Sequence, residues 1–164
     1  MPGARFCVCT GAQMPDSTDP HHLQRFVDAQ EWAFADALAE LGAGQKRTHW
    51  MWFIFPQLAE LGRSETARFF GIRSADEAQA YLAHPLLGSR LRQCCVALLR
   101  HRSRSAEAIM GSVDALKLKS SMTLFEAIAD DRSSFAAVLD AFYLGARDAL
   151  TLDLLGRAGT PIVS

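Results

Sequence analysis

The sequence predicts an all-α protein, a compact single domain of about six or seven short helices with an ordered aromatic crossing segment. Two observations support this prediction. Apolar residues recur at three- and four-residue steps along most of the chain, as on the buried face of a helix. Serine or aspartate, followed by an acidic residue or proline, marks several helix starts. Residues 49–57 lack the helical period, but no second strand candidate accompanies them, so we expect no sheet.

The first helix is expected to begin at Asp19-Pro20, an acidic N-cap followed by proline, and to end near Gly42. Gln30 interrupts its apolar stripe, one turn from both Phe26 and Phe34. A buried amide without hydrogen-bond partners costs about 1–3 kcal/mol. Two interpretations therefore stay open: Gln30 holds the backbone of a neighbouring loop, or it faces a pocket.

The aromatic stretch QKRTHWMWFIFPQ at 45–57 follows. Its aromatic and aliphatic residues alternate, which predicts a short extended segment buried on both faces and ended by Pro56. A cationic cluster directly precedes it. This arrangement is either a core plug with a charged edge or the wall and rim of a ligand pocket. The residues concerned are Lys46, Arg47, His49, Trp50, Trp52 and Gln57.

Later helices begin at recognisable caps. Ser64 is expected to cap SETARFF, and Ser74 with Glu77 forms a capping box that opens SADEAQAYLA. Amphipathic patterns then predict helices in PLLGSRLRQCCVALLRHR, AEAIM, DALKLKSSMTLFEAIA and SSFAAVLDAFYLGA. We expect the folded domain to span 19–155, between a flexible arm at 1–18 and a C-terminal tail at 156–164.

Composition excludes several classes of function. The net charge of −1 lacks the basic excess of a nucleic-acid binder. No segment approaches the length of an apolar membrane span, and no signal peptide is evident, so we expect a cytoplasmic protein. The four cysteines, at 7, 9, 94 and 95, lack zinc-site spacing, which predicts no metal and fits a reducing compartment. No cofactor motif is present.

Two polar clusters are candidates for chemistry. His49 would act as a general acid or base if a substrate lay within hydrogen-bond reach, or would only bind a backbone carbonyl as a structural group. In DALKLKSSMTLF, residues 114–125, Lys117 and Ser120 lie on adjoining rows of a helix with Asp114. They form either a polar seam or a solvated face.

Four stretches are distinctive: RFVDAQ at 25–30, KRTHWMWFIFPQL at 46–58, SADEAQAYLAHPLLGSRL at 74–91 and DALKLKSSMTLF at 114–125. They resemble an uncharacterised bacterial family, the domain of unknown function numbered eighteen-ten, over roughly residues 19–155. The resemblance implies a compact, mostly helical domain. Members are often labelled calpastatin, but calpain inhibitors of that name are disordered polar chains, whereas this composition supports a packed core.

A remoter similarity links the chain to helical domains of NAD and ADP-ribose metabolism. Those domains use a glutamate, a glutamine and a lysine on early elements, and Gln30, Glu31 and Lys46 match these in kind while departing in spacing. The similarity implies a nucleotide-like small-molecule ligand, with N-glycosidic hydrolysis as the possible reaction. Glu31 and His49 would be catalytic. The ligand-binding residues would be Gln30, Lys46, Arg47, Trp50, Trp52, Gln57, Lys117 and Ser120. The alternative is a non-enzymatic module that docks a protein partner through the aromatic loop 49–57.

Overall fold

The computed structural model describes residues 18–159. Within this range the chain forms nine α-helices, six of them with seven residues or more, and a short 3-10 helix, η2. No strand occurs among these residues, where Leu58 and Ile72 form only an isolated parallel bridge. The all-α prediction is confirmed. The elements are α1 (Gln24–Ala43), α2 (Met51–Ile54), η2 (Ala59–Leu61), α3 (Glu65–Phe69), α4 (Ala75–Ala83), α5 (Leu87–Leu99), α6 (Ala106–Met110), α7 (Ser112–Ile128), α8 (Ser133–Tyr143) and α9 (Ala149–Gly159).

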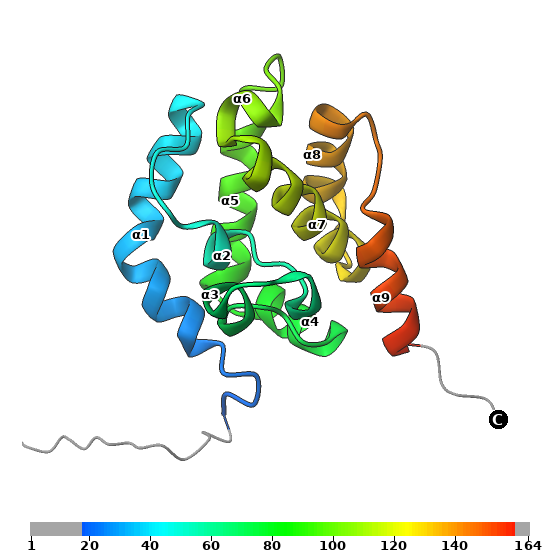
Figure 1. Ribbon diagram of the computed structural model, residues 1–164. Coiled ribbons are helices and arrows are strands. Elements are labelled where there is room, and N and C mark those ends of the chain that lie inside the picture. Colours follow the sequence, from blue (N-terminus) through cyan, green and yellow to red (C-terminus); the bar gives the residue numbers. More distant parts are fainter. Residues whose placement is uncertain (1–17, 160–164) are drawn as a thin grey trace, which may run out of the picture.

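Helix α5 runs through the middle of the molecule (Figure 1) and packs against α1, α4 and α8. Helix α7 contacts α4, α6, α8 and α9. The short elements α2, η2 and α3 lie between the α1 side and the α7 side of the fold (Figure 1). The segment that contains these short elements, residues 51–69, is therefore held between α1 on one side and α7 on the other (Figure 1).

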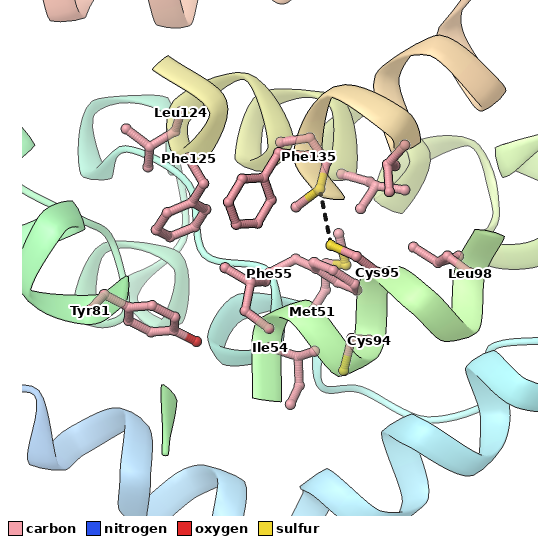
Figure 2. Close-up of a cluster of buried hydrophobic side chains, with 14 of the residues drawn as sticks. Met51, Ile54, Phe55, Tyr81, Cys94, Cys95, Leu98, Leu124, Phe125 and Phe135 are labelled. Atoms are coloured by element: carbon pink, nitrogen blue, oxygen red, sulfur yellow. Dashed lines mark hydrogen bonds between the residues drawn. The ribbon is translucent and has the colours of Figure 1, made fainter. Parts of the chain in front are cut away.

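The core consists of buried aromatic and aliphatic side chains from α1, α2, α4, α5, α6, α7 and α8. Figure 2 shows Phe125 and Phe135 side by side above Phe55, with ring centroids 5.8 Å apart for the first two. Cys94 and Cys95 are buried there as small apolar residues, and burial raises the pKa of both thiols. They are therefore protonated and unreactive.

Both ends of α1 differ from the prediction. The helix begins at Gln24 rather than at Asp19-Pro20, although Asp19 still caps it: its carboxylate accepts hydrogen bonds from the backbone N–H groups of Leu23 and Gln24. It ends at Ala43, where Gly44 adopts a left-handed φ of 75°. The C-cap is thus the second glycine of the LGAG sequence and not Gly42, because only Gly44 has the left-handed backbone.

The aromatic crossing segment is not extended. Met51–Ile54 forms one helical turn, and the amide of Phe55 donates to the carbonyl of Met51. The alternation of large apolar residues led to the expectation of an extended segment buried on both faces. Helical geometry instead buries Trp50, Met51, Ile54 and Phe55, while Trp52 and Phe53 stay half-buried. The ordered crossing between helices is present, in a helical form.

The later helices follow their predicted starts. The Ser64 hydroxyl accepts from the amide of Ala67, and the Ser74 hydroxyl from the amide of Glu77. Glu77 reaches back to the amide of Arg73, one residue before the cap. Helix α9 was not predicted, although Asp148 caps it by accepting from the amide of Thr151. It includes residues 156–159 of the expected tail, while the expected arm lies outside the described residues except for Thr18.

A buried ion pair joins the start of α1 to α4. Arg25 donates to Glu77 at 2.6 Å, and each side chain is at most 4% exposed. Its other donors bind the carbonyls of Phe69 and Gly71, so the loop after α3 is fixed by the same group. Because the guanidinium is hydrogen-bonded on several sides, its burial is well compensated.

Candidate functional site

The loop that leads into α2 is organised by one carboxylate. Glu40, in the last turns of α1, accepts hydrogen bonds from the backbone amides of Arg47 and Thr48, the Thr48 hydroxyl and the indole N–H of Trp50. Partial burial alone would raise the pKa of Glu40, but these hydrogen bonds outweigh it and lower the pKa to about 2. The loop therefore packs onto an ionised glutamate.

Lys46 is occupied by neighbours within the fold. Its ammonium lies 3.0 Å from the Asp114 carboxylate on α7 and donates to the carbonyl of Thr48 at 2.5 Å. It also lies 4.8 Å from the ring centroid of Trp50. The side chain is 7% exposed. Lys46 thus links the loop to α7, and its charge is already paired.

Trp50 and Gln30 are also held in the interior. Trp50 is 1% exposed, with its indole N–H bound to Glu40. The Gln30 amide donates to the carbonyl of Phe53 at 2.7 Å and to the Tyr81 hydroxyl at 3.0 Å. Of the two interpretations left open for Gln30, its geometry fits the one in which it holds a neighbouring loop. These contacts leave neither side chain a face for a ligand.

Trp52 is the indole of this loop that remains accessible to a ligand. It is half-buried, the ring of His49 lies 6.4 Å from its ring, and the Lys117 ammonium lies 5.7 Å from its centroid. His49 itself is exposed. Lys117 comes from α7 and Trp52 from α2, so these two helices come close together at the Trp52 ring.

A groove of about 490 Å³ extends from this point. Gln57, Lys117 and Ser120, three of the predicted ligand-binding residues, line it. Gln57 and Lys117 also line a small cavity beside the groove, and the Trp52 indole lines that cavity and not the groove itself. These four residues come from two segments that are distant in sequence, 45–57 and 114–125, and the fold brings the two segments together.

The walls of the groove are apolar on one side and polar at the base. Val113 and Leu116 project from α7 and are 64% and 68% exposed. At the base, the Ser120 hydroxyl donates to Asp148 at 3.2 Å, and the same carboxylate accepts from Thr151. Arg63, an exposed residue between η2 and α3, adds a second cation to the lining.

Besides Gln30, Lys46, His49 and Trp50, two further predicted residues lie outside this groove. Glu31 is exposed on α1 and Arg47 is exposed in the loop, and neither lines the groove. Sequence reasoning missed three residues that matter here, Glu40, Arg63 and Asp148. It named Asp114 beside Lys117 but did not foresee the ion pair of Asp114 with Lys46. Asp148 had a local signal, because it precedes the amphipathic run ALTLDLL as a helix cap. The contacts of Glu40 and Asp114 with the loop had no such signal in the local sequence.

Comparison with known families identifies the domain. The model of a family described as a protein of unknown function (DUF1810) matches residues 20–155. The chain belongs to the DUF1810 family. The fold of this DUF1810 chain also matches a crystal structure of the conserved hypothetical protein Rv1873 from Mycobacterium tuberculosis. That protein is 49% identical, with a TM-score of 0.83 over 84% of this chain and 99% of the other. No functionally curated protein matches the chain.

The described part of this DUF1810 domain holds no group of three His, Cys, Asp or Glu side chains arranged to bind a metal ion. Between residues 18 and 159, no helix is long and apolar enough to cross a membrane. The groove instead offers an ammonium group, an amide and a hydroxyl, and the Trp52 ring lines the small cavity beside it. This set of groups suits a ligand that combines a planar ring with an anionic substituent.

Proposed function

We propose that this DUF1810 protein binds a nucleotide-like small molecule, of the ADP-ribose or NAD-derived class, in the groove between α3 and α7. The observation that carries the proposal is the approach of Lys117 to Trp52. The Lys117 ammonium lies 5.7 Å from the Trp52 ring centroid, and Lys117 lines both a groove of about 490 Å³ and the small adjoining cavity that Trp52 lines. A volume between about 300 and 1,000 Å³ is typical of ligand sites.

Each group has a role in this proposal. The half-buried Trp52 ring stacks on the base, an interaction worth about 1–3 kcal/mol. Lys117 neutralises a phosphate, and Arg63 at the rim contacts a second one. Gln57 and Ser120 hydrogen-bond the sugar or the base edge. Lys46 has no part in it because its charge is paired with Asp114.

Hydrolysis of an N-glycosidic bond is the reaction we propose for such a ligand. His49 is the predicted acid–base group, and its ring is 6.4 Å from the Trp52 ring. The other predicted catalytic residue, Glu31, is exposed on α1 and does not line the groove. Turnover is tested by release of nicotinamide from NAD, with His49→Gln as the variant that loses it while binding is retained.

A protein-docking role is the second candidate. Val113 and Leu116 flank the groove and are largely exposed, as hydrophobic residues at partner surfaces often are. The aromatic loop itself supports this candidate less, because Trp50 and Phe55 are buried and present no surface.

The binding test is a thermal-shift titration with ADP-ribose, NAD, AMP and ribose 5-phosphate. A ligand at 100 times its Kd stabilises the fold by about 2.7 kcal/mol. We expect a dose-dependent shift with wild type that is lost in Lys117→Gln and in Trp52→Ala. Lys119→Gln is the matched control, since Lys119 lies on the same helix and does not line the groove. Absence of a shift with all four compounds would contradict the proposal and favour the docking role.

A further inference from the structure

A second hollow, of about 810 Å³, lies where the end of α1 meets α5 and the turn between α4 and α5. It shares no lining residue with the groove at Trp52. Its walls are largely apolar, with Leu38 from α1, Leu82 from α4 and the exposed Val96 from α5. Its size is again that of a ligand site, about 300–1,000 Å³.

Two glycines line this hollow, and they differ in what surrounds them. Gly88 is required by packing, since a Cβ there would lie 2.0 Å from the carbonyl oxygen of Leu82. Gly42 is different: it lies within α1, its φ is not left-handed, and a Cβ would meet nothing within 4 Å. A glycine in a helix costs about 0.5–1 kcal/mol relative to alanine. No contact of the fold explains Gly42, and it leaves space in the hollow.

The charge of the lining has one sign. Among the described residues that line the hollow none is acidic, whereas His84, Arg92 and Arg100 are basic. Arg100 is exposed at the end of α5, next to the end of α1 in the lining. The Nδ1 atom of His84 accepts hydrogen bonds from the amides of Leu86 and Leu87, so the proton of the neutral ring is on Nε2. The rim thus offers cations and a donor, and no competing carboxylate.

Arg92 is held at the far end of the same lining. Its guanidinium donates to the carbonyl of Asp131 at 3.2 Å and lies 4.9 Å from the ring centroid of Phe135. Arg92 contributes positive potential while being fixed by the fold, whereas Arg100 is the arginine whose charge can be removed without loss of such contacts. Arg100 is therefore the residue to vary.

From these observations we propose that the hollow is a second ligand site, for a small molecule that joins an apolar body to a carboxylate or sulfonate group. The apolar body lies against Leu38, Leu82 and Val96, over the space left by Gly42. The anionic group lies at the basic rim. Asp131 lies close to Arg92 outside the lining, so the positive potential of the rim comes chiefly from Arg100. With no acidic residue in the lining itself, this potential selects an anion over a cation of the same apolar body.

The test uses the fluorescent sulfonate 8-anilinonaphthalene-1-sulfonate on the full chain, with circular dichroism to verify that each variant is folded. We expect saturable binding by wild type, displaced by decanoate and not by decyltrimethylammonium. Gly42→Leu fills the hollow and removes binding. Arg100→Gln weakens it by about tenfold, the loss of one charged contact.

The matched controls keep binding. Ala35→Leu adds the same bulk to exposed surface of α1 outside the lining, and Arg102→Gln removes an exposed arginine outside it. The proposal is overturned if folded Gly42→Leu binds the sulfonate as wild type does, if the cation displaces it as well as decanoate, or if wild-type binding does not saturate. Because the two sites share no residue, a failure here leaves the nucleotide groove unaffected.

Discussion

The indole nitrogen of Trp50 donates a 2.9 Å hydrogen bond to Glu40, which lies ten residues earlier in the chain, near the end of α1. The same carboxylate oxygen accepts from the amides of Arg47 and Thr48. A single ionised side chain on α1 thereby fixes the path of the chain into α2. The most distinctive stretch of the sequence is thus held largely by structural contacts. Within it, Gln57 lines the groove and the half-buried Trp52 lines the small cavity beside it.

Glu40→Gln is expected to destabilise the fold by about 2 kcal/mol at pH 7, because hydrogen bonds to a charged acceptor are worth about 1.5–3 kcal/mol. The pKa of Glu40 is lowered to about 2 in the folded protein from an ordinary value of 4.5. Its contribution is thus present above pH 4.5 and is lost as the pH falls toward 2. Urea unfolding at pH 7 and at pH 3 tests this. The difference in the free energy of unfolding between wild type and Glu40→Gln should be smaller at pH 3. An equal difference at both pH values would contradict the role of the ionised carboxylate.

Lys46→Ala is expected to lower the free energy of unfolding by about 1–3 kcal/mol, because Asp114 and the carbonyl of Thr48 lose their partner. Arg47→Ala is the control. That side chain is exposed, and the backbone amide of Arg47, which binds Glu40, is kept. Its effect should stay within about 0.5 kcal/mol. Equal effects of the two substitutions in urea unfolding would show that Lys46 is not a structural link.

Ser121→Ala is expected to be neutral or to stabilise the fold by up to about 1 kcal/mol. Among the described residues, the buried Ser121 hydroxyl has no hydrogen-bond partner, so its removal relieves a desolvation penalty. The adjacent Ser120→Ala should instead cost about 1 kcal/mol, since the Ser120 hydroxyl donates to Asp148. In thermal unfolding, the midpoint temperature should fall for Ser120→Ala and should stay the same or rise for Ser121→Ala. A Ser121→Ala variant less stable than Ser120→Ala would refute the assignment.

Substitution of alanine for two helical glycines, Gly88 and Gly42, should change the free energy of unfolding in opposite directions. Gly88→Ala forces a Cβ against the carbonyl of Leu82 and should destabilise by about 1–3 kcal/mol. Gly42→Ala meets open space and should stabilise by about 0.5–1 kcal/mol. Chemical denaturation of both variants tests this. A destabilising Gly42→Ala would mean that the glycine has a packing role after all.

Features decided by neighbours in sequence were predictable. The Ser64 and Ser74 caps are examples, because a cap bonds an amide only three residues away. Residues 51–54 were misjudged for the opposite reason. A short aromatic run fits a strand or a helical turn equally well, and its conformation depends on packing. The C-cap of α1 was placed two residues early, at Gly42 instead of Gly44, because LGAG offers two glycines and local sequence does not choose between them.

The candidate site was only partly predictable. Lys117 and Gln57 were chosen as polar residues in distinctive stretches, but nothing in the sequence indicated that they line one groove 60 residues apart in the chain. Lys46 and Trp50 have the residue types of a binding site. Their partners, Asp114 and Glu40, are distant in sequence, and these contacts assign both residues to the structure of the loop. Long-range pairing of this kind is set by the tertiary fold and not by local pattern.

The most direct measurement of the central claim uses the three tryptophans as reporters. The indole N–H signals of Trp32, Trp50 and Trp52 are resolved by ¹H–¹⁵N correlation spectroscopy and assigned with single Trp→Phe variants. During titration with ADP-ribose, the account predicts a saturable shift of the Trp52 signal. The signals of Trp32, exposed on α1, and of Trp50, bound to Glu40, should stay in place. A saturable shift of Trp32 or Trp50 with Trp52 unmoved, or no shift of any indole signal, would contradict a nucleotide-binding groove at Trp52 and Lys117.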